Sequence, residues 1–169
     1  MSSNLSSKQK GNIGLANAIL LFSINGFDMS LPLTESTKYD LIIDIDYKLY
    51  KVQCKFTNYS PNGSNNIYTV PLYVSGGNRS GGSNKILYSE NDIDLIFASC
   101  GSTNHYLLPF NQIKTQKTIN IGNLKKYEKY KIDIYNHNPN AICNIIKMVG
   151  REGFEPTNPE GNDFTDHLL

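Results

Sequence analysis

Two consecutive runs between residues 39 and 57 alternate apolar and polar side chains, and no other part of the sequence limits the fold as strongly. The apolar members are Leu41, Ile43 and Ile45 in the first run and Val52, Cys54 and Phe56 in the second. A period of two is typical of β-strands, because successive side chains point to opposite faces of a sheet. The pattern therefore predicts a β-hairpin with one apolar face and one polar face, the latter carrying Lys51, Gln53 and Lys55.

The region before the hairpin predicts one helix and one loop. From residue 8 to about residue 25, apolar side chains recur at helical spacings, after a Ser-rich start and before Gly26. This pattern is typical of an amphipathic helix that ends at a glycine. Residues 28–37 contain Pro32 and several turn-forming side chains, so we expect a loop there.

Further strands are expected after the hairpin. Residues 67–75 have a strand-like composition, and the glycine-rich residues 76–85 predict a loop. Residues 94–100 are almost continuously apolar, as in a strand covered on both faces, and residues 106–110 predict another central strand. Residues 123–135 mix charged and aromatic side chains without a clear period, so helix and strand both remain open there.

The composition fits a single domain over residues 1–149. The chain has 169 residues, of which 39% are hydrophobic and 11% aromatic, enough for one core but not for two full domains. Residues 150–169 contain one basic and five acidic side chains with several glycines and prolines, so we expect a disordered acidic tail. The net charge of +1 then leaves +5 on residues 1–149, which is compatible with a polyanionic partner.

Some functional classes find no support in the sequence. No apolar run approaches the roughly 18 residues of a membrane span, and no signal peptide is visible, so we expect a cytoplasmic protein without a membrane partner. Cys54, Cys100 and Cys143 are spaced too widely for a zinc ribbon or a disulfide framework, which predicts buried, reduced thiols. Neither a Gly-Lys-Ser/Thr phosphate-binding motif nor histidines at metal-ligand spacing are present.

Three polar side chains of the predicted hairpin carry the clearest chemical signal. Asp40 opens the first strand, and Gln53 and Lys55 share one face of the second. Because paired strands lie about 5 Å apart, a carboxylate, an amide and an ammonium converge there without a long loop. A hard cation would find oxygen ligands in Asp40, the Gln53 amide and the Cys54 carbonyl. Lys55 would orient the attacking water or stabilise a phosphorane, so the set suits phosphodiester hydrolysis.

The order of these features resembles the PD-(D/E)XK nuclease superfamily over roughly residues 8–115. The shared features are the K-G-x-x-G helix, Y-D-L-I-I followed by Q-C-K, and the strands D-I-D-L-I-F-A-S-C and Y-L-L-P-F. A narrower similarity is to small group I intron homing endonucleases of the cyanobacterial tRNA-intron type, in which Gln replaces the acid of the E-x-K motif. The resemblance implies an α/β, restriction-endonuclease-like core, with a mixed β-sheet flanked by helices.

The resemblance also implies an activity and the roles of individual residues. It implies a site-specific homing endonuclease that hydrolyses double-stranded DNA with Mg²⁺. Asp40 matches the metal ligand, Gln53 the substituted acid and Lys55 the catalytic lysine. Because one chain carries one such set, cutting both strands requires a homo-oligomer, either a dimer or, as in the resembled family, a tetramer.

One position departs from the family pattern. Relatives often have a Glu directly after the second glycine of K-G-x-x-G, where this chain has Leu15. Asp40 is then the only formal anion of the motif, which lowers the expected affinity for a metal ion. Glu35, five residues before Asp40, is a candidate for the missing metal ligand, the alternative being a solvated loop acid.

The glycine-rich loop is the candidate DNA contact. Its donors are Asn78, Arg79, Asn84 and Lys85. Such side chains contact phosphates or base edges when they lie on a loop beside a catalytic sheet. An idle surface loop is the alternative.

Three other functions remain open. The first is a catalytically degenerate DNA-binding or intron-assisting protein of the same fold, motivated by Leu15 and Gln53. The second is a resolvase-like junction nuclease, and the third is a protein-interaction domain whose polar strand face is merely solvated. Divalent-cation affinity at Asp40 separates the nucleases from the interaction domain.

Overall fold

The computed structural model describes residues 5–34, 36–58, 67–75, 85–101, 103–114, 116–122 and 124–150. Its helices are α1 (Ser7–Ile24), α2 (Lys125–Glu128) and α3 (Pro139–Ile146), with 3₁₀ turns at Phe110–Gln112 and Lys147–Val149. Its strands are β1 (Asp28–Ser30), β2 (Leu41–Ile45), β3 (Lys48–Thr57), β4 (Ile67–Pro71), β5 (Tyr73–Ser75), β6 (Lys85–Leu87), β7 (Leu95–Cys100), β8 (Asn104–Pro109), β9 (Thr118–Gly122) and β10 (Lys131–Ile132).

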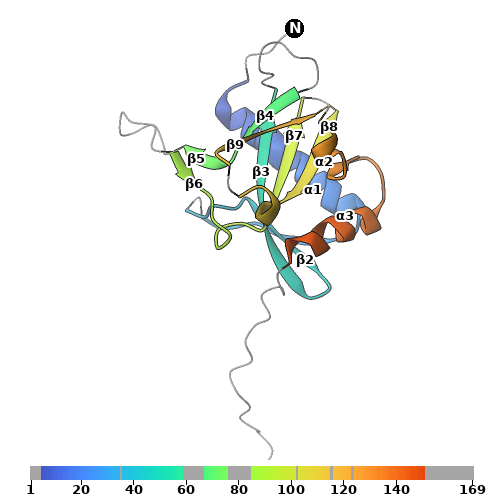
Figure 1. Ribbon diagram of the computed structural model, residues 1–169. Coiled ribbons are helices and arrows are strands. Elements are labelled where there is room, and N and C mark those ends of the chain that lie inside the picture. Colours follow the sequence, from blue (N-terminus) through green and yellow to red (C-terminus); the bar gives the residue numbers. More distant parts are fainter. Residues whose placement is uncertain are drawn as a thin grey trace, which may run out of the picture.

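A six-stranded mixed sheet forms the centre of the fold, in the order β1-β2-β3-β7-β8-β10 (Figure 1). Strands β3 and β7 are parallel, and every other neighbouring pair in this sheet is antiparallel. Helix α1 packs against β3 and β7, and α3 packs against β8. Two small sheets, β4–β9 and β5–β6, complete the described strands. This architecture confirms the expected α/β fold with a mixed sheet flanked by helices.

Helix α1 begins and ends where its sequence predicts. Ser6 is the N-cap, and its side chain and that of Gln9 exchange hydrogen bonds with each other's backbone N–H groups as a capping box. Asn25 caps the other end, and Gly26 follows with a φ of 74°, a conformation that glycine adopts without strain. The prediction of a helix over residues 8–25 is therefore confirmed.

Gly14 determines how closely α1 approaches the sheet. A Cβ atom at this position would lie 3.2 Å from the carbonyl carbon of Lys55 and 3.3 Å from the Phe56 backbone nitrogen. Such distances are shorter than almost all Cβ contacts in proteins, so a residue without a side chain lets the helix lie this close to β3 without displacing it. The second glycine of K-G-x-x-G therefore brings α1 directly onto the backbone of the predicted catalytic lysine.

The predicted hairpin is formed by β2 and β3. Leu41 pairs with Val52, and Ile43 pairs with Tyr50, in an antiparallel ladder. Asp46 and Tyr47 both have positive φ values, 53° and 62°, as tight hairpin turns require. The apolar run at 94–100 is confirmed as β7, which is buried along its whole length between two neighbours.

A buried polar chain connects α1 to the sheet. Asn17 of α1 donates to the Ser99 hydroxyl at 2.8 Å, and Ser99 contacts Nδ1 of His105 at 3.1 Å. Ser99 and His105 are both buried, and their contact gives His105 Nδ1 a hydrogen-bond partner, whereas Nε2 of the same ring has none among the described residues. This chain fixes the position of α1 relative to β7 and β8.

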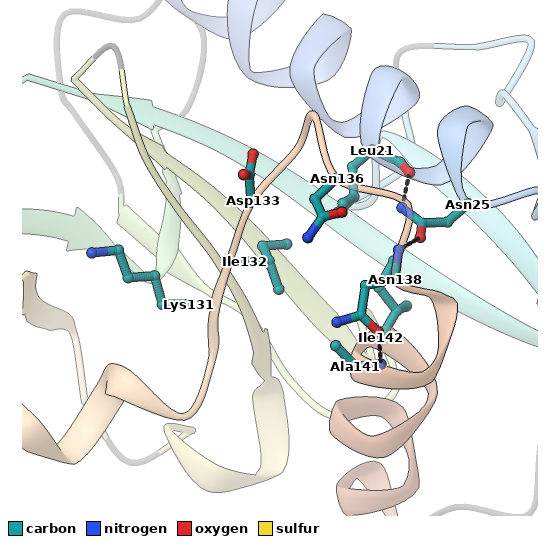
Figure 2. A pocket seen from close by; sticks show the side chains of 9 residues that line it. All are labelled: Leu21, Asn25, Lys131, Ile132, Asp133, Asn136, Asn138, Ala141 and Ile142. Atoms are coloured by element: carbon teal, nitrogen blue, oxygen red, sulfur yellow. Dashed lines mark hydrogen bonds between the residues drawn. The ribbon is translucent and has the colours of Figure 1, made fainter.

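The C-terminal end of α1 is tied to α3 by Asn25 (Figure 2). The buried Asn25 amide donates to the Leu21 carbonyl at 2.8 Å and accepts from the Asn138 backbone at 2.6 Å. A small pocket of about 100 Å³ lies here and is lined by α1, β10 and α3. Because Asn25 and Asn138 use their hydrogen bonds to join α1 to the start of α3, we assign this region a structural role.

Some expectations for the secondary structure are wrong. The loop expected at 28–37 contains strand β1, which pairs with β2 as a three-residue edge strand. The strand expected at 67–75 is divided at Leu72 into β4 and β5, which belong to different sheets. Residues 123–135, left open between helix and strand, contain α2 and β10. Helix α3, which Asn138 caps, was not predicted.

Cys54, Cys100 and Cys143 are all free thiols, as expected. Cys54 and Cys100 are buried as predicted, whereas Cys143 is only partly buried. The expected tail at 150–169 lies outside the described residues apart from Gly150. Within the described ranges, no helix is long and apolar enough to span a membrane.

Candidate active site

Asp40 and Gln53 meet at the open end of the β2–β3 ladder. The Asp40 N–H donates to the Val52 carbonyl at 2.9 Å, so the ladder continues one residue before β2. This register brings Asp40 opposite Gln53, and the Gln53 amide Nε2 donates to Asp40 Oδ2. The same carboxylate oxygen accepts the Cys54 N–H at 2.7 Å. The two residues predicted to converge are therefore in direct contact.

Gln53 is buried, which is unusual for a side chain on the polar face of a hairpin. It is only 9% exposed. Besides Asp40, its Nε2 lies 3.2 Å from the Cys54 carbonyl oxygen. The alternative of a merely solvated strand face is therefore wrong at this position, because a buried amide is retained only where it finds polar partners.

Lys55 points its ammonium to a different set of partners. Its Nζ donates to the Tyr88 hydroxyl at 2.6 Å and to the Tyr73 carbonyl at 3.3 Å, and lies 4.9 Å from the centre of the Tyr88 ring. Among the described residues, no ion pair joins this ammonium to Asp40. Lys55 therefore shares the site with Asp40 without neutralising its charge directly.

Burial destabilises the charged forms of Lys55 and Asp40 and shifts the pKa values of both groups. It lowers the pKa of Lys55 to about 8, although Asp40 and Cys54 oppose that shift. It raises the pKa of Asp40, although the Cys54 N–H and the Lys55 charge stabilise the carboxylate. Oppositely charged groups that are both destabilised by desolvation are typical of active sites, because structure alone gains little from them.

An open cleft of about 660 Å³ lies over these residues. Its walls come from the N-terminal half of α1 and from the β2–β3 end. The lining residues are Ser7, Lys8, Lys10, Gly11, Asn12, Leu15, Asp40, Gln53, Cys54, Lys55, Phe56 and Pro71. The position where relatives often carry a Glu, Leu15, therefore shares the cleft with Asp40.

Lys8 and Lys10 are cleft residues that the sequence did not single out. Both come from the first turn of α1, which contains no acidic side chain. Their positive charges lie on the helix wall that faces the β2–β3 end. The sequence offered one signal, the basic residue Lys10 directly before the first glycine of K-G-x-x-G. Its place in the cleft follows from how α1 packs on the sheet, which the sequence alone does not show.

The other predicted site residues are only partly described. Glu35, Asn78, Arg79 and Asn84 lie outside the described residues. Lys85 begins β6, is exposed, and has its Nζ 4.8 Å from the centre of the Tyr73 ring. Among the described residues, no three His, Cys, Asp or Glu side chains form a group that could hold a metal ion. In this part of the chain, the protein groups that contact the Asp40 carboxylate or its partner amide are the Gln53 amide, the Cys54 N–H and the Cys54 carbonyl.

Comparison with known proteins identifies the family. A family model described as PD-(D/E)XK endonuclease matches residues 5–136. Among solved structures, a bacterial homing endonuclease, I-Ssp6803I, superposes with a TM-score of 0.63 at 23% identity, covering 87% of this chain and 98% of that one. A search of curated proteins found no match. The match over most of the sequence confirms the expected resemblance, and the chain belongs to the PD-(D/E)XK endonuclease family.

Proposed function

We propose that this protein is a site-specific DNA endonuclease of the homing type that hydrolyses phosphodiester bonds at Asp40, Gln53 and Lys55. The observation that carries the proposal is that Asp40 and Gln53 are in direct contact and share one open cleft with Lys55. Membership of an endonuclease family and likeness in fold to a bacterial homing endonuclease support it. A group I intron origin and a cytoplasmic location are proposed on the resemblance alone.

The donor set at Asp40 fits a divalent metal ion, the cofactor that PD-(D/E)XK nucleases use, and we propose Mg²⁺. The Gln53 amide nitrogen lies between the Asp40 carboxylate and the Cys54 carbonyl, so a positively polarised group already bridges two oxygens. If the Gln53 amide flips, its oxygen takes the place of its nitrogen and becomes a third metal ligand beside Asp40 and the Cys54 carbonyl. The set is hard and oxygen-only, as Mg²⁺ prefers, and carries a single negative charge. We propose Glu35 as a further anionic ligand.

A bound divalent ion would polarise the scissile phosphate and lower the pKa of water. The chain's own contribution is Lys55, whose ammonium would face the charge that grows on the phosphate oxygens. With a pKa of about 8, Lys55 carries its proton in most molecules at neutral pH. Because it is desolvated, its charge acts more strongly than that of a solvent-exposed lysine.

Replacing Leu15 with Glu should restore the carboxylate that relatives often have at this position. Because Leu15 and Asp40 line the same cleft, a second anion there should tighten Mg²⁺ binding or raise the cleavage rate. Calorimetry with Mg²⁺ and single-turnover cleavage measure the two effects, with Leu15→Gln as the uncharged control. Loss of stability without a gain in metal affinity would mean that Leu15 only packs against the core.

Replacing Lys8 and Lys10 together with Ala should weaken DNA binding, because both line the cleft wall opposite the acidic centre. If each neutralises one phosphate, the slope of log affinity against log salt should fall by about two per subunit. Lys125→Ala with Lys126→Ala is the control, since it removes the same charge from α2. If the wild type and the Lys8/Lys10 variant show the same slope of log affinity against log salt, the DNA does not contact this wall of the cleft.

Cutting both DNA strands would require at least two copies, so we propose a homo-oligomer, a dimer or a tetramer. Lys85 and the neighbouring Asn78, Arg79 and Asn84 are proposed to contact DNA. The main alternative is a catalytically degenerate DNA-binding protein, favoured by the uncharged side chains of Gln53 and Leu15. A resolvase-like junction nuclease would use the same residues on a branched substrate.

The test is cleavage of a library of duplexes with randomised sequence, followed by sequencing of the new ends. With Mg²⁺ and wild-type protein, we expect ends to accumulate at one sequence, and with EDTA none should form. Binding to the library without new ends would favour the degenerate alternative. Cleavage confined to branched DNA would favour the junction nuclease.

A further inference from the structure

The ammonium of Lys55 is held from one side by the β5–β6 pair. Tyr73 is the first residue of β5, and Tyr88 directly follows β6. The Lys55 Nζ lies 2.6 Å from the Tyr88 hydroxyl and 3.3 Å from the Tyr73 carbonyl oxygen. We infer that Tyr88 is a positioning residue whose hydroxyl holds the Lys55 ammonium in place for phosphodiester hydrolysis. The inference rests on the proposed nuclease function.

Tyr88 is itself firmly fixed. It is 6% exposed, and its ring packs edge-on against Phe110, with centroids 6.5 Å apart and planes at 90°. Its backbone N–H donates to the Leu72 carbonyl at 3.4 Å. A side chain held by a packed ring and an anchored backbone can fix the position of a flexible partner.

Tyr88 contacts Lys55 without lining the cleft itself. Lys55 is one of the residues that line the cleft, whereas Tyr88 is not. Any effect of Tyr88 on the reaction must therefore pass through Lys55, which separates positioning from direct contact with DNA.

The hydrogen bonds of the Lys55 ammonium explain why its positioning by Tyr88 should affect the cleavage rate. A lysine ammonium has three N–H donors on a stem with four rotatable bonds. The Tyr88 hydroxyl and the Tyr73 carbonyl take two donors, which leaves one for a phosphate oxygen or a water. Without this restraint Lys55 would sample several rotamers, and its charge would be aligned with the phosphate only part of the time.

Tyr88→Phe isolates the hydroxyl. The variant keeps the ring, its packing on Phe110 and the 4.9 Å approach of the Lys55 ammonium to the ring. Tyr130→Phe is the matched control, because Tyr130 is also buried and has Lys129 Nζ at the same 4.9 Å from its ring centre, outside the cleft.

Tyr88→Phe should lower the single-turnover cleavage rate by about 10- to 100-fold. The affinity for DNA and the melting temperature should stay at wild-type values, and Tyr130→Phe should cleave normally. In ¹⁵N-lysine NMR, the Lys55 ammonium signal, assigned by its loss in Lys55→Met, should shift or broaden in Tyr88→Phe only.

Two readouts separate failure of this inference from failure of the proposed function. If the wild type cleaves and Tyr88→Phe cleaves equally fast, the positioning role is wrong although the nuclease function stands. If the wild type cleaves no DNA, the nuclease function fails, and the NMR signal still tests the contact. An unchanged Lys55 signal in Tyr88→Phe would overturn the inference in either case.

Discussion

Asp40→Asn and Lys55→Met are each expected to lower single-turnover DNA cleavage by at least about 100-fold, as the loss of one transition-state contact does in other enzymes. Asp40→Asn removes the negative charge of the side chain that accepts hydrogen bonds from the Gln53 amide and the Cys54 N–H. Lys55→Met keeps the stem of the side chain but removes the charge. DNA affinity should change little, because neither substitution touches the lysines on the α1 wall.

Asp44→Asn is the control for the carboxylate, since Asp44 lies in β2, the strand that Asp40 directly precedes, and does not line the cleft. It should cleave at the wild-type rate. If Asp40→Asn or Lys55→Met also cleaves at that rate, the assignment of the site is wrong.

Lys55→Met should not destabilise the fold at neutral pH. Burial lowers the pKa of Lys55 from 10.5 to about 8, so between these values the unfolded chain binds this proton more tightly than the folded one. Stability then decreases as the pH falls through that window, and the penalty is complete below pH 8. Lys55→Met lacks this penalty, so its melting temperature at pH 7 should equal or exceed that of the wild type.

Gly14→Val is expected to lower the free energy of unfolding by about 2–4 kcal/mol, in the range of overpacking and backbone displacement. All three atoms closest to the added Cβ belong to the backbone of Lys55 and Phe56, so the clash cannot be relieved by a side-chain rotation. Helix α1 would have to move away from β3, which would also displace the cleft wall. Urea denaturation measures the loss.

Gly11→Val is the matched control for Gly14→Val. It lies one turn earlier in the same helix, and a Cβ there meets nothing within 4 Å. Because valine has a higher helix propensity than glycine, we expect a gain of a few tenths of a kcal/mol. Equal losses in both variants would show that α1 does not pack through Gly14.

The parts of the site that lie on neighbouring strands could be predicted from the sequence. Asp40, Gln53 and Lys55 follow from the period of two and from the register of one short hairpin, which are local properties. Their types and spacing also carried the family resemblance. The buried run of β7 could be predicted for a similar reason, since a strand covered on both faces needs continuous apolar side chains.

The remaining parts depend on packing between distant segments. Tyr88 lies 33 residues after Lys55, and nothing in its own neighbourhood indicates that its hydroxyl meets the lysine. Lys8 and Lys10 become cleft residues only because Gly14 brings α1 onto β3. Strand β1 has three residues, too few for a periodic pattern, and pairs only because β2 offers an open edge. Such features follow from tertiary contacts and not from local sequence.

The most direct measurement is the single-turnover rate of cleavage of the selected DNA site by the wild-type protein as a function of Mg²⁺ concentration. If Asp40, Gln53 and Lys55 form a metal-dependent nuclease site, the rate should rise from zero in EDTA to a plateau. Both DNA strands should be cut at fixed positions. A rate that is unchanged by EDTA, or intact DNA at every Mg²⁺ concentration despite tight binding, would contradict this function.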